Sequence, residues 1–229
     1  MTHLLYNIIF TFFLIFAAPY FLLRALINGR FRKELAQRMG FFPNLPFKRP
    51  IWVHAASVGE VFCSAPMIKR IKEEFPHHEI VLTTMTETGK EAAKSHIPET
   101  DRIFFFPIDH PFTIRRTIKR IHPHLLLIAE TELWPNLLRY CGKKGIPIVL
   151  FNGRISDKSF RRYLLLRFFF KNCLQFISLF LMQTEKDQKR IIDIGAASDK
   201  TKVAGNLKFD QTPPSITEEE MAEMSKSLD

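Results

Sequence analysis

From residue 51 onward, short apolar runs alternate with longer amphipathic stretches, and this alternation constrains the fold more than any other feature. It predicts strands at 51–54, 79–84, 102–106, 125–129, 146–151 and 180–183. It predicts helices near 59–75, 86–96, 111–121, 134–144, 157–177 and 185–194. Strands that alternate with helices are typical of βαβ units, which build a parallel sheet. The fold class predicted is α/β, with a Rossmann-like parallel sheet and helices on both faces.

The amino-terminal end carries a second strong signal, an uncharged apolar run from Leu4 to Leu23. Twenty helical residues at about 1.5 Å each cover the roughly 30 Å core of a bilayer. No basic residue precedes the run, whereas seven lie between Arg24 and Arg49. This asymmetry predicts an uncleaved anchor with its amino terminus outside and the rest of the chain cytoplasmic. A cleaved signal peptide is the alternative, but its basic residues normally precede the apolar run.

The two signals together divide the chain into four parts. Residues 1–24 form the predicted transmembrane anchor, and residues 25–50 form a basic juxtamembrane segment and linker. The basic helix in that segment is expected beside anionic lipid headgroups, with a solvated connector as the alternative. Residues 51–210 form the predicted Rossmann-like domain. Residues 211–229 combine two prolines with an acidic helical pattern, which is typical of a linker toward a further domain.

The charge balance indicates an anionic partner. Lys and Arg total 33 against 23 Asp and Glu, which gives a net charge of +10. Such an excess favours nucleic acid, phosphorylated small molecules or an acidic membrane surface. The sequence contains no nucleic-acid-binding motif, no Walker motif and no G-x-G-x-x-G, so we expect neither a nucleic-acid partner nor a dinucleotide cofactor. The three cysteines and the paired histidines lack the spacing of metal ligands, so no metal site is predicted.

Polar residues follow the predicted strands at corresponding places. The most prominent are Glu60, Thr86, Glu130, Glu132, Asn152 and Arg154. In open α/β sheets, ligands bind at the carboxyl ends of the strands, where the loops lead into helices. We therefore expect these side chains to gather along one edge of the sheet.

The first of these places is the sequence Ser57-Val58-Gly59-Glu60. Gly59 suits a close approach of the backbone or an unusual dihedral angle. Glu60 falls in the first turn of the next helix, where the helix dipole favours a carboxylate. Two interpretations stay open, a capping arrangement at the helix start or a general base for a substrate hydroxyl.

The second place is the sequence from Glu130 to Asn136. Glu130 and Glu132 follow directly on a buried run, and two neighbouring acids repel each other. Their presence favours a ligand, a cation or a hydrogen-bond network, with a capped helix and one solvated glutamate as the alternative. Trp134 is expected in the core. Further on, Arg154 suits a phosphate or a carboxylate, or equally the carboxyl end of a helix.

Beyond Ser156, cations alternate with Leu and Phe residues. Arg167 and Lys171 make a second membrane span over 163–182 unfavourable. A buried helix and a helix lying on the membrane both fit the pattern. The candidates for membrane or phosphate contact are Arg161, Arg162, Arg167 and Lys171.

Six motifs in sequence order resemble the 3-deoxy-D-manno-octulosonic acid (Kdo) transferases of lipopolysaccharide synthesis. They are HAASVGE, TTMTETG, FFFPIDHP, AETELWPN, FNGRIS and GNLKFD. The resemblance runs from about Arg24 to Asp210 and includes the anchor. It implies the amino-terminal, acceptor-binding half of a GT-B glycosyltransferase. It also implies inverting transfer of Kdo from CMP-Kdo to a lipid A precursor at the inner membrane, without a cofactor.

The resemblance further implies roles for single residues. Glu60 matches the general base, and Glu130 or Glu132 matches a second essential acidic position. The candidates for acceptor binding are Ser57, Gly59, Thr86, Asn152, Arg154 and Ser156. Since the family's donor-binding domain follows this region, we expect the 229-residue chain to transfer little or no Kdo alone. A non-catalytic, membrane-anchored binding module is the alternative, and a different lipid-directed sugar transferase is a third interpretation.

Overall fold

A computed structural model describes residues 2–43 and 50–210, and a parallel sheet of seven strands lies at its centre. The strands are β1 (Ile51–His54), β2 (Ile80–Thr84), β3 (Arg102–Phe105), β4 (Leu125–Ala129), β5 (Ile148–Gly153), β6 (Leu179–Met182) and β7 (Thr201–Val203). Their order is β3-β2-β1-β4-β5-β6-β7. The chain winds outward in both directions from β1 and β4, which is the doubly wound arrangement of Rossmann-like sheets. The predicted fold class is confirmed.

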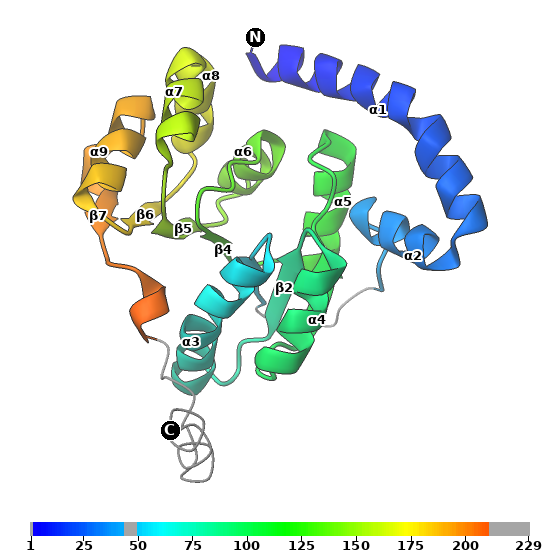
Figure 1. Cartoon of the computed structure of the whole chain (residues 1–229), viewed down its shortest axis with the longest axis horizontal. Helices are drawn as coiled ribbons and strands as arrows, with labels where there is room; N and C mark the ends of the chain where they lie inside the picture. Colours follow the sequence, from blue (N-terminus) through cyan, green and yellow to red (C-terminus); the bar gives the residue numbers. More distant parts are fainter. Residues whose placement is uncertain (1, 44–49, 211–229) are drawn as a thin grey trace, which may run out of the picture.

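Helices cover both faces of the sheet (Figure 1). One face carries α3 (Val58–Glu74) and α4 (Glu87–His96). The other face carries α5 (Pro111–Ile121), α6 (Pro135–Lys143), α8 (Arg167–Leu174) and α9 (Glu185–Ile194). The remaining helical segments are α7 (Asp157–Leu165) and the short 3-10 turns η1 (Ser198–Lys200) and η2 (Leu207–Asp210). Two apolar cores result, one on each side of the sheet.

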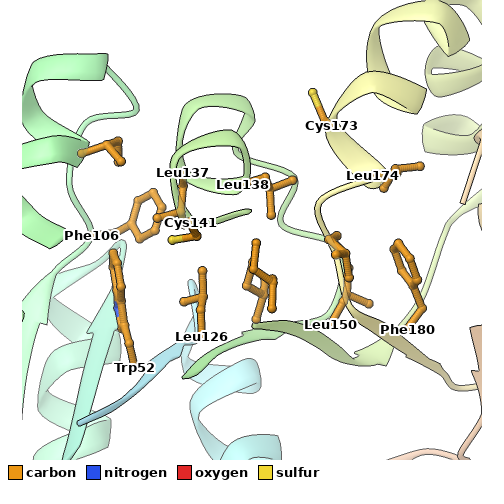
Figure 2. Packing of buried hydrophobic residues seen from close by; sticks show 14 of the residues in the cluster. Trp52, Phe106, Leu126, Leu137, Leu138, Cys141, Leu150, Cys173, Leu174 and Phe180 are labelled. Carbon is orange, nitrogen blue, oxygen red and sulfur yellow. The ribbon is translucent and has the colours of Figure 1, made fainter. Parts of the chain in front are cut away.

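The larger core lies between the sheet and α6 and α8. Figure 2 shows Trp52, Leu126, Leu150 and Phe180 pointing from neighbouring strands toward these helices. All four side chains are fully or almost fully buried, and so is Cys141 on the facing helix. Because side chains alternate between faces along a strand, Val53 and Leu127 point into the opposite core.

Three of the strands and α-helices differ from the sequence-based expectation by more than one residue at an end. The strand predicted at 146–151 lies at 148–153, because Pro147 has no N–H to donate to the ladder. The helix predicted over 157–177 is two helices that meet at Leu166, so that Cys173 and Leu174 are buried while Leu165 is exposed. The strand β7 was not predicted, because its three residues include Lys202 and make no apolar run.

Two helices precede the sheet, α1 (Thr2–Ile27) and α2 (Gly29–Arg38). By length and composition, α1 is able to cross a membrane. The basic helix predicted within 25–50 is α2, which begins after the cap that Asn28 Oδ1 makes to the N–H of Phe31 at 3.0 Å. Part of that linker, 44–49, and the predicted linker 211–229 lie outside the described residues.

Candidate active site

The loops that leave β1, β2, β4 and β5 meet at the carboxyl edge of the sheet. The Met85 N–H donates to the Ala56 carbonyl at 3.0 Å, which joins the first two loops. The Thr131 hydroxyl donates to the Arg154 carbonyl at 2.5 Å, which joins the last two. The predicted gathering of these loops is therefore present, and it places the three glutamates on one edge of the sheet.

Glu60 is buried at the start of α3 and both of its carboxylate oxygens accept hydrogen bonds. Oε2 accepts from the Ala56 N–H at 2.8 Å, and Oε1 accepts from the Ser57 hydroxyl at 2.9 Å. Ser57 is also the N-cap of the helix, since its Oγ accepts from the Glu60 N–H at 3.3 Å. The capping interpretation is confirmed, and these hydrogen bonds hold the carboxylate in one orientation.

The surroundings of Glu60 change its acidity. Burial, together with the smaller effect of the Glu132 and Glu130 charges, raises the pKa of the Glu60 carboxyl to about 7, although the bonds from Ala56 and Ser57 oppose the rise. A carboxyl with a pKa near 7 can accept a proton and release it again at neutral pH. The structure thus places a group with suitable acid–base properties at the sheet edge.

Glu130 and Glu132 occupy the loop between β4 and α6. Glu130 has a left-handed backbone, with φ at 53°, and its N–H donates to the Phe151 carbonyl at 2.9 Å. Burial raises the pKa of the Glu132 carboxyl, the Trp134 indole opposes this rise, and the Glu130 charge adds to it. The left-handed region is uncommon for a residue other than glycine, asparagine or aspartate. Trp134 packs against Phe106 at 5.0 Å between ring centroids, as expected of a core residue.

Asn152 is the second non-glycine residue of the site in the left-handed region, with φ at 53°. Its Oδ1 accepts from the Leu207 N–H at 3.2 Å, and its carbonyl accepts from Gln183 at 3.0 Å. The Nδ2 group is buried and has no hydrogen-bond partner among the described residues. Asn152 therefore connects β5 to η2 and leaves one donor unused.

The other candidates for acceptor binding have diverse local roles. Thr86 and Ser156 are N-caps, of α4 and α7 respectively, and both are exposed. Position 59 does not require a glycine for backbone conformation or packing. Its φ is not positive, and a Cβ added to Gly59 would meet only Ser57 Oγ, at 3.9 Å. The expectation of an unusual dihedral at Gly59 is wrong. Arg154 is exposed, and its side chain caps no helix within the described residues 2–43 and 50–210, so its guanidinium is accessible.

The four cations predicted to contact membrane or phosphate lie elsewhere. Arg161 and Arg162 are exposed on α7, and Arg167 and Lys171 are exposed on α8. The latter two line a hollow of about 430 Å³ beside the end of α9. Within residues 2–43 and 50–210, no hydrogen bond or ion pair joins these cations to the three glutamates.

Sequence reasoning missed a buried network at the same sheet edge, centred on Asp109. Its carboxylate accepts from the backbone N–H groups of Asn136 and Leu137, each at 2.9 Å, at the start of α6. The Tyr6 hydroxyl of α1 donates to the same carboxylate at 3.1 Å. Burial raises the pKa of Asp109 to about 6. The motif FFFPIDHP contains this acid, but its partner Tyr6 lies in a segment that was expected inside a bilayer.

Comparison with known proteins points to one family. The family model described as "3-Deoxy-D-manno-octulosonic-acid transferase (kdotransferase)" matches residues 33–211. The chain is 36% identical to a 3-deoxy-D-manno-octulosonic acid transferase of Haemophilus influenzae, over 80% of this chain and 43% of the relative. It is 33% identical to the enzyme of the same name from Chlamydophila psittaci, over 89% of this chain and 49% of the relative.

A bifunctional glycosyltransferase/methyltransferase of Fusobacterium nucleatum is 35% identical, over 90% of this chain and 31% of that protein. This chain therefore spans less than half the length of the curated relatives it matches. Among solved structures, UDP-GlcNAc 2-epimerase from Neisseria meningitidis bound to UDP-GlcNAc is similar, with a TM-score of 0.52 and 12% identity. The match covers 79% of this chain and 54% of that one, and at this identity it shows the fold alone.

Proposed function

The chain belongs to the Kdo transferase family, and on that premise we propose that it is the acceptor-binding half of a Kdo transferase of lipopolysaccharide biosynthesis. The donor is CMP-Kdo and the acceptor is a lipid A precursor. Glu60 is the general base of this proposal. The observation that carries it is a buried carboxylate at the carboxyl edge of the sheet, with a pKa of about 7.

The proposed reaction is an inverting transfer. Glu60 accepts the proton of an acceptor hydroxyl, and the resulting alkoxide attacks the anomeric carbon of Kdo. The bond between that carbon and the CMP phosphate breaks, and CMP leaves with its electron pair. Positioned proton transfer of this kind contributes about 10²–10⁴-fold to a rate. The bonds from Ala56 and Ser57 support the role, because they keep the carboxylate pointing in one direction.

Glu130 and Glu132 form the second acidic position of the proposal. Their charges act on Glu60, since both raise its pKa and so make it a stronger base once it is ionised. Ser57, Gly59, Thr86, Asn152, Arg154 and Ser156 are the proposed acceptor contacts. Of these, the exposed Arg154 guanidinium suits an acceptor phosphate. Arg161, Arg162, Arg167 and Lys171 are proposed to contact lipid phosphates.

Residues 1–24 supply membrane attachment in this proposal, and residues 51–210 bind the acceptor on the cytoplasmic side of the inner membrane. The composition and length of α1 suit either a crossing of the bilayer or a position along its surface. The net charge of +10 suits both anionic lipids and a phosphorylated acceptor.

A non-catalytic binding module is a second candidate, and one observation favours it. Both carboxylate oxygens of Glu60 already accept hydrogen bonds within the fold, as a purely structural cap would. The catalytic and the non-catalytic function predict different effects of Glu60→Gln on transfer, because Gln keeps the size of the side chain and removes its basicity.

The test uses a version in which a donor-binding domain follows this chain, with radiolabelled CMP-Kdo and a lipid A precursor. We expect Glu60→Gln to lower transfer about 10²–10⁴-fold and to leave acceptor binding within twofold. The matched control is Glu91→Gln, an exposed glutamate on α4, which should transfer at the unchanged rate. Unchanged transfer by Glu60→Gln would remove Glu60 as the base, and lost acceptor binding would indicate a structural role.

A further inference from the structure

The helix α5 carries a cluster of cations that no step of the proposed reaction uses. Basic residues occupy positions 115, 116, 119 and 120, and the helix contains no Asp or Glu. Arg115 and Lys119 are both exposed and lie one helical turn apart. Neither of them, nor Arg116, forms an ion pair within residues 2–43 and 50–210. This side of α5 therefore presents positive charge to the solvent without acids to balance it.

Two exposed aromatic rings lie among these cations. Phe41 is 52% and Phe112 is 54% exposed. The Arg116 guanidinium lies against both rings, 3.8 Å from the centre of Phe41 and 4.3 Å from the centre of Phe112. An open hollow of about 380 Å³ is lined by Phe112 and the four cations of the helix. Aromatic rings beside cations are typical of surfaces that meet lipid headgroups, because the rings reach the apolar layer and the cations meet the phosphates.

The basic side of α5 is fixed to the end of α2 and to the turn that follows it, and the two helices are neighbours in the fold (Figure 1). The carbonyl of Arg38, the last residue of α2, accepts from the Ile108 N–H at 2.9 Å, three residues before α5 begins. A Cβ at Gly40 would lie 2.9 Å from the Thr117 hydroxyl, so the turn is in close contact with α5. The cations of α2 and α5 therefore keep a fixed relative position.

The position of α2 in the chain identifies the partner of this surface. A single residue, Asn28, separates α2 from the apolar helix α1, and α2 has exposed cations of its own at Arg30, Arg32 and Lys33. Since α1 supplies membrane attachment in the proposed function, α2 starts at the membrane surface. Because α5 is held to the end of α2, its cations lie beside the same surface. This continuity favours anionic lipid over a nucleic acid or an acidic protein.

We propose that this surface docks on the anionic phospholipid headgroups of the cytoplasmic leaflet. The α5 face, as we name it, consists of Phe41, Phe112, Arg115, Arg116, Lys119 and Arg120. Headgroup phosphates occupy the hollow and accept from the exposed side chains of Arg115 and Lys119. The loop between β3 and α5 holds Asp109 at the carboxyl edge of the sheet, so docking fixes the orientation of that edge relative to the membrane. The inference rests on membrane attachment by α1 and on no step of the transfer reaction.

The test uses the full chain in lipid nanodiscs, with a fluorophore attached at Phe112→Cys to report contact with headgroups. Labelling is selective, because the three native cysteines are buried. The discs contain phosphatidylcholine with a nitroxide quencher on its headgroup, with or without phosphatidylglycerol. We expect about threefold stronger quenching in the discs with phosphatidylglycerol, and high salt should remove the difference by screening. The control position is Ser95→Cys, exposed on α4, where quenching should be weak in both kinds of disc.

Two double variants, both labelled at position 112, separate the local charge from the total charge. Arg115→Gln with Lys119→Gln removes two cations of the α5 face, and Lys69→Gln with Lys94→Gln removes two exposed cations from α3 and α4. Each basic residue beside an anionic surface strengthens binding about fivefold. We therefore expect the first variant to lower the quenching to the level in neutral discs and the second to leave it unchanged. Equal effects of the two variants would overturn the proposal, because net charge alone would then explain the binding.

Three further outcomes would overturn the proposal. Equal quenching at position 112 in neutral and anionic discs would show that the α5 face does not recognise anionic headgroups. Loss of quenching on addition of inorganic phosphate at constant ionic strength would indicate a site for a small anion instead of a lipid surface. A chain that stays in the discs without quenching at position 112 would overturn the docking and leave the attachment by α1 intact, whereas a chain that does not enter the discs would contradict both.

Discussion

At the scale of single residues, Glu60 combines two roles that the sequence left as alternatives. The same carboxylate that completes the cap of α3 is buried beside two further acids. Its bonds from Ala56 and Ser57 favour the charged form, whereas burial and the charges of Glu130 and Glu132 favour the neutral form. Burial outweighs the bonds, and the result is a carboxyl that titrates near neutral pH rather than near pH 4.

This balance predicts how stability depends on pH. The Glu60 pKa is raised in the folded chain to about 7, so the fold binds this proton more tightly than the unfolded chain does. The stabilisation by the proton is complete below about pH 4.5 and is lost as the pH rises through 7. The original chain should therefore lose stability as the pH rises, whereas Glu60→Gln has no such carboxyl. The unfolding free energy of Glu60→Gln, minus that of the original chain, should increase by about 3 kcal/mol from pH 4.5 to pH 8.

Urea unfolding of both proteins in detergent, at several pH values, measures this difference. Because Asp109 titrates in both proteins, its contribution cancels in the comparison. The exposed Glu91→Gln is the matched control and should follow the original chain at every pH. A difference between Glu60→Gln and the original chain that does not change with pH would contradict the raised pKa.

Residue roles were predictable from sequence only where they are local. Ser57 caps Glu60 three residues away, which a sequence motif can indicate. The left-handed backbone of Glu130 and Asn152 was not predictable, since neither residue requires it and the loop geometry imposes it. The bond between Tyr6 and Asp109 joins residues 103 positions apart, and only the folded chain brings them together.

At the scale of elements, the helix α6 shows how the sheet edge is built. It starts at Pro135 without a side-chain cap of its own, since Trp134 cannot accept a hydrogen bond. Asp109, from the loop after β3, supplies the missing acceptor to the N–H groups of Asn136 and Leu137. A carboxylate at a helix start is favoured by the helix dipole. The acid therefore fixes the position of α6, and with it the loop that carries Glu130 and Glu132.

The start of α4 has an equally specific requirement. A Cβ at Gly89 would lie 2.3 Å from the Thr84 hydroxyl, and that hydroxyl donates to the Ala56 carbonyl at 3.1 Å. Gly89→Ala should thus lower the unfolding free energy by about 1–2 kcal/mol, because overpacking outweighs the gain in helix propensity. Gly29→Ala, at the start of α2, is the matched control, since nothing lies within 4 Å of the added Cβ.

Urea unfolding of the two variants beside the original chain measures the effect. We expect Gly29→Ala to be unchanged or up to about 1 kcal/mol more stable. If Gly89→Ala were as stable as Gly29→Ala, the close packing of α4 on β2 would be refuted.

Most strands and helices were predictable from the sequence. Buried parallel strands are short continuous apolar runs, whereas helices repeat their apolar residues about every 3.6 positions. The strands at 51–54 and 125–129 and the helices at 111–121 and 185–194 have the predicted bounds. The break at Leu166 was not predictable, since Leu and Phe residues lie on both sides of it and Arg167 alone does not end a helix. Only the packing of Cys173 and Leu174 on the sheet requires the chain to turn there.

At the scale of the whole molecule, the apolar helix α1 contacts the same sheet edge that carries the three glutamates. The contacts of α1 with Asp109 and Asn136 place this apolar helix at the edge where Glu60 lies. Under the proposed function, an acceptor anchored in the leaflet would present its sugar to Glu60 at this edge. The composition of the sequence indicated membrane attachment, but the orientation of α1 depends on contacts between distant residues.

The last prediction concerns the proposed binding of acceptor and donor by two different domains. The chain spans 43% of the Haemophilus influenzae relative, and residues 2–43 and 50–210 contain a single sheet with one carboxyl edge. Under the proposed function, that edge binds the acceptor, and the donor requires a second Rossmann-like domain. We therefore expect the 229-residue chain to bind a lipid A precursor in vesicles but to transfer no Kdo from radiolabelled CMP-Kdo.

The measurement is label recovered in the lipid fraction, with the two-domain version as positive control. Acceptor binding by the 229-residue chain, measured by flotation with the vesicles, shows that the tested protein is folded.

Arg154→Ala should weaken that binding about tenfold if the guanidinium contacts an acceptor phosphate, whereas the exposed Arg102→Ala at the opposite end of the sheet should not. Transfer by the 229-residue chain at the rate of the two-domain version would show that this sheet alone binds both substrates, and the assignment of the acceptor to it would fail.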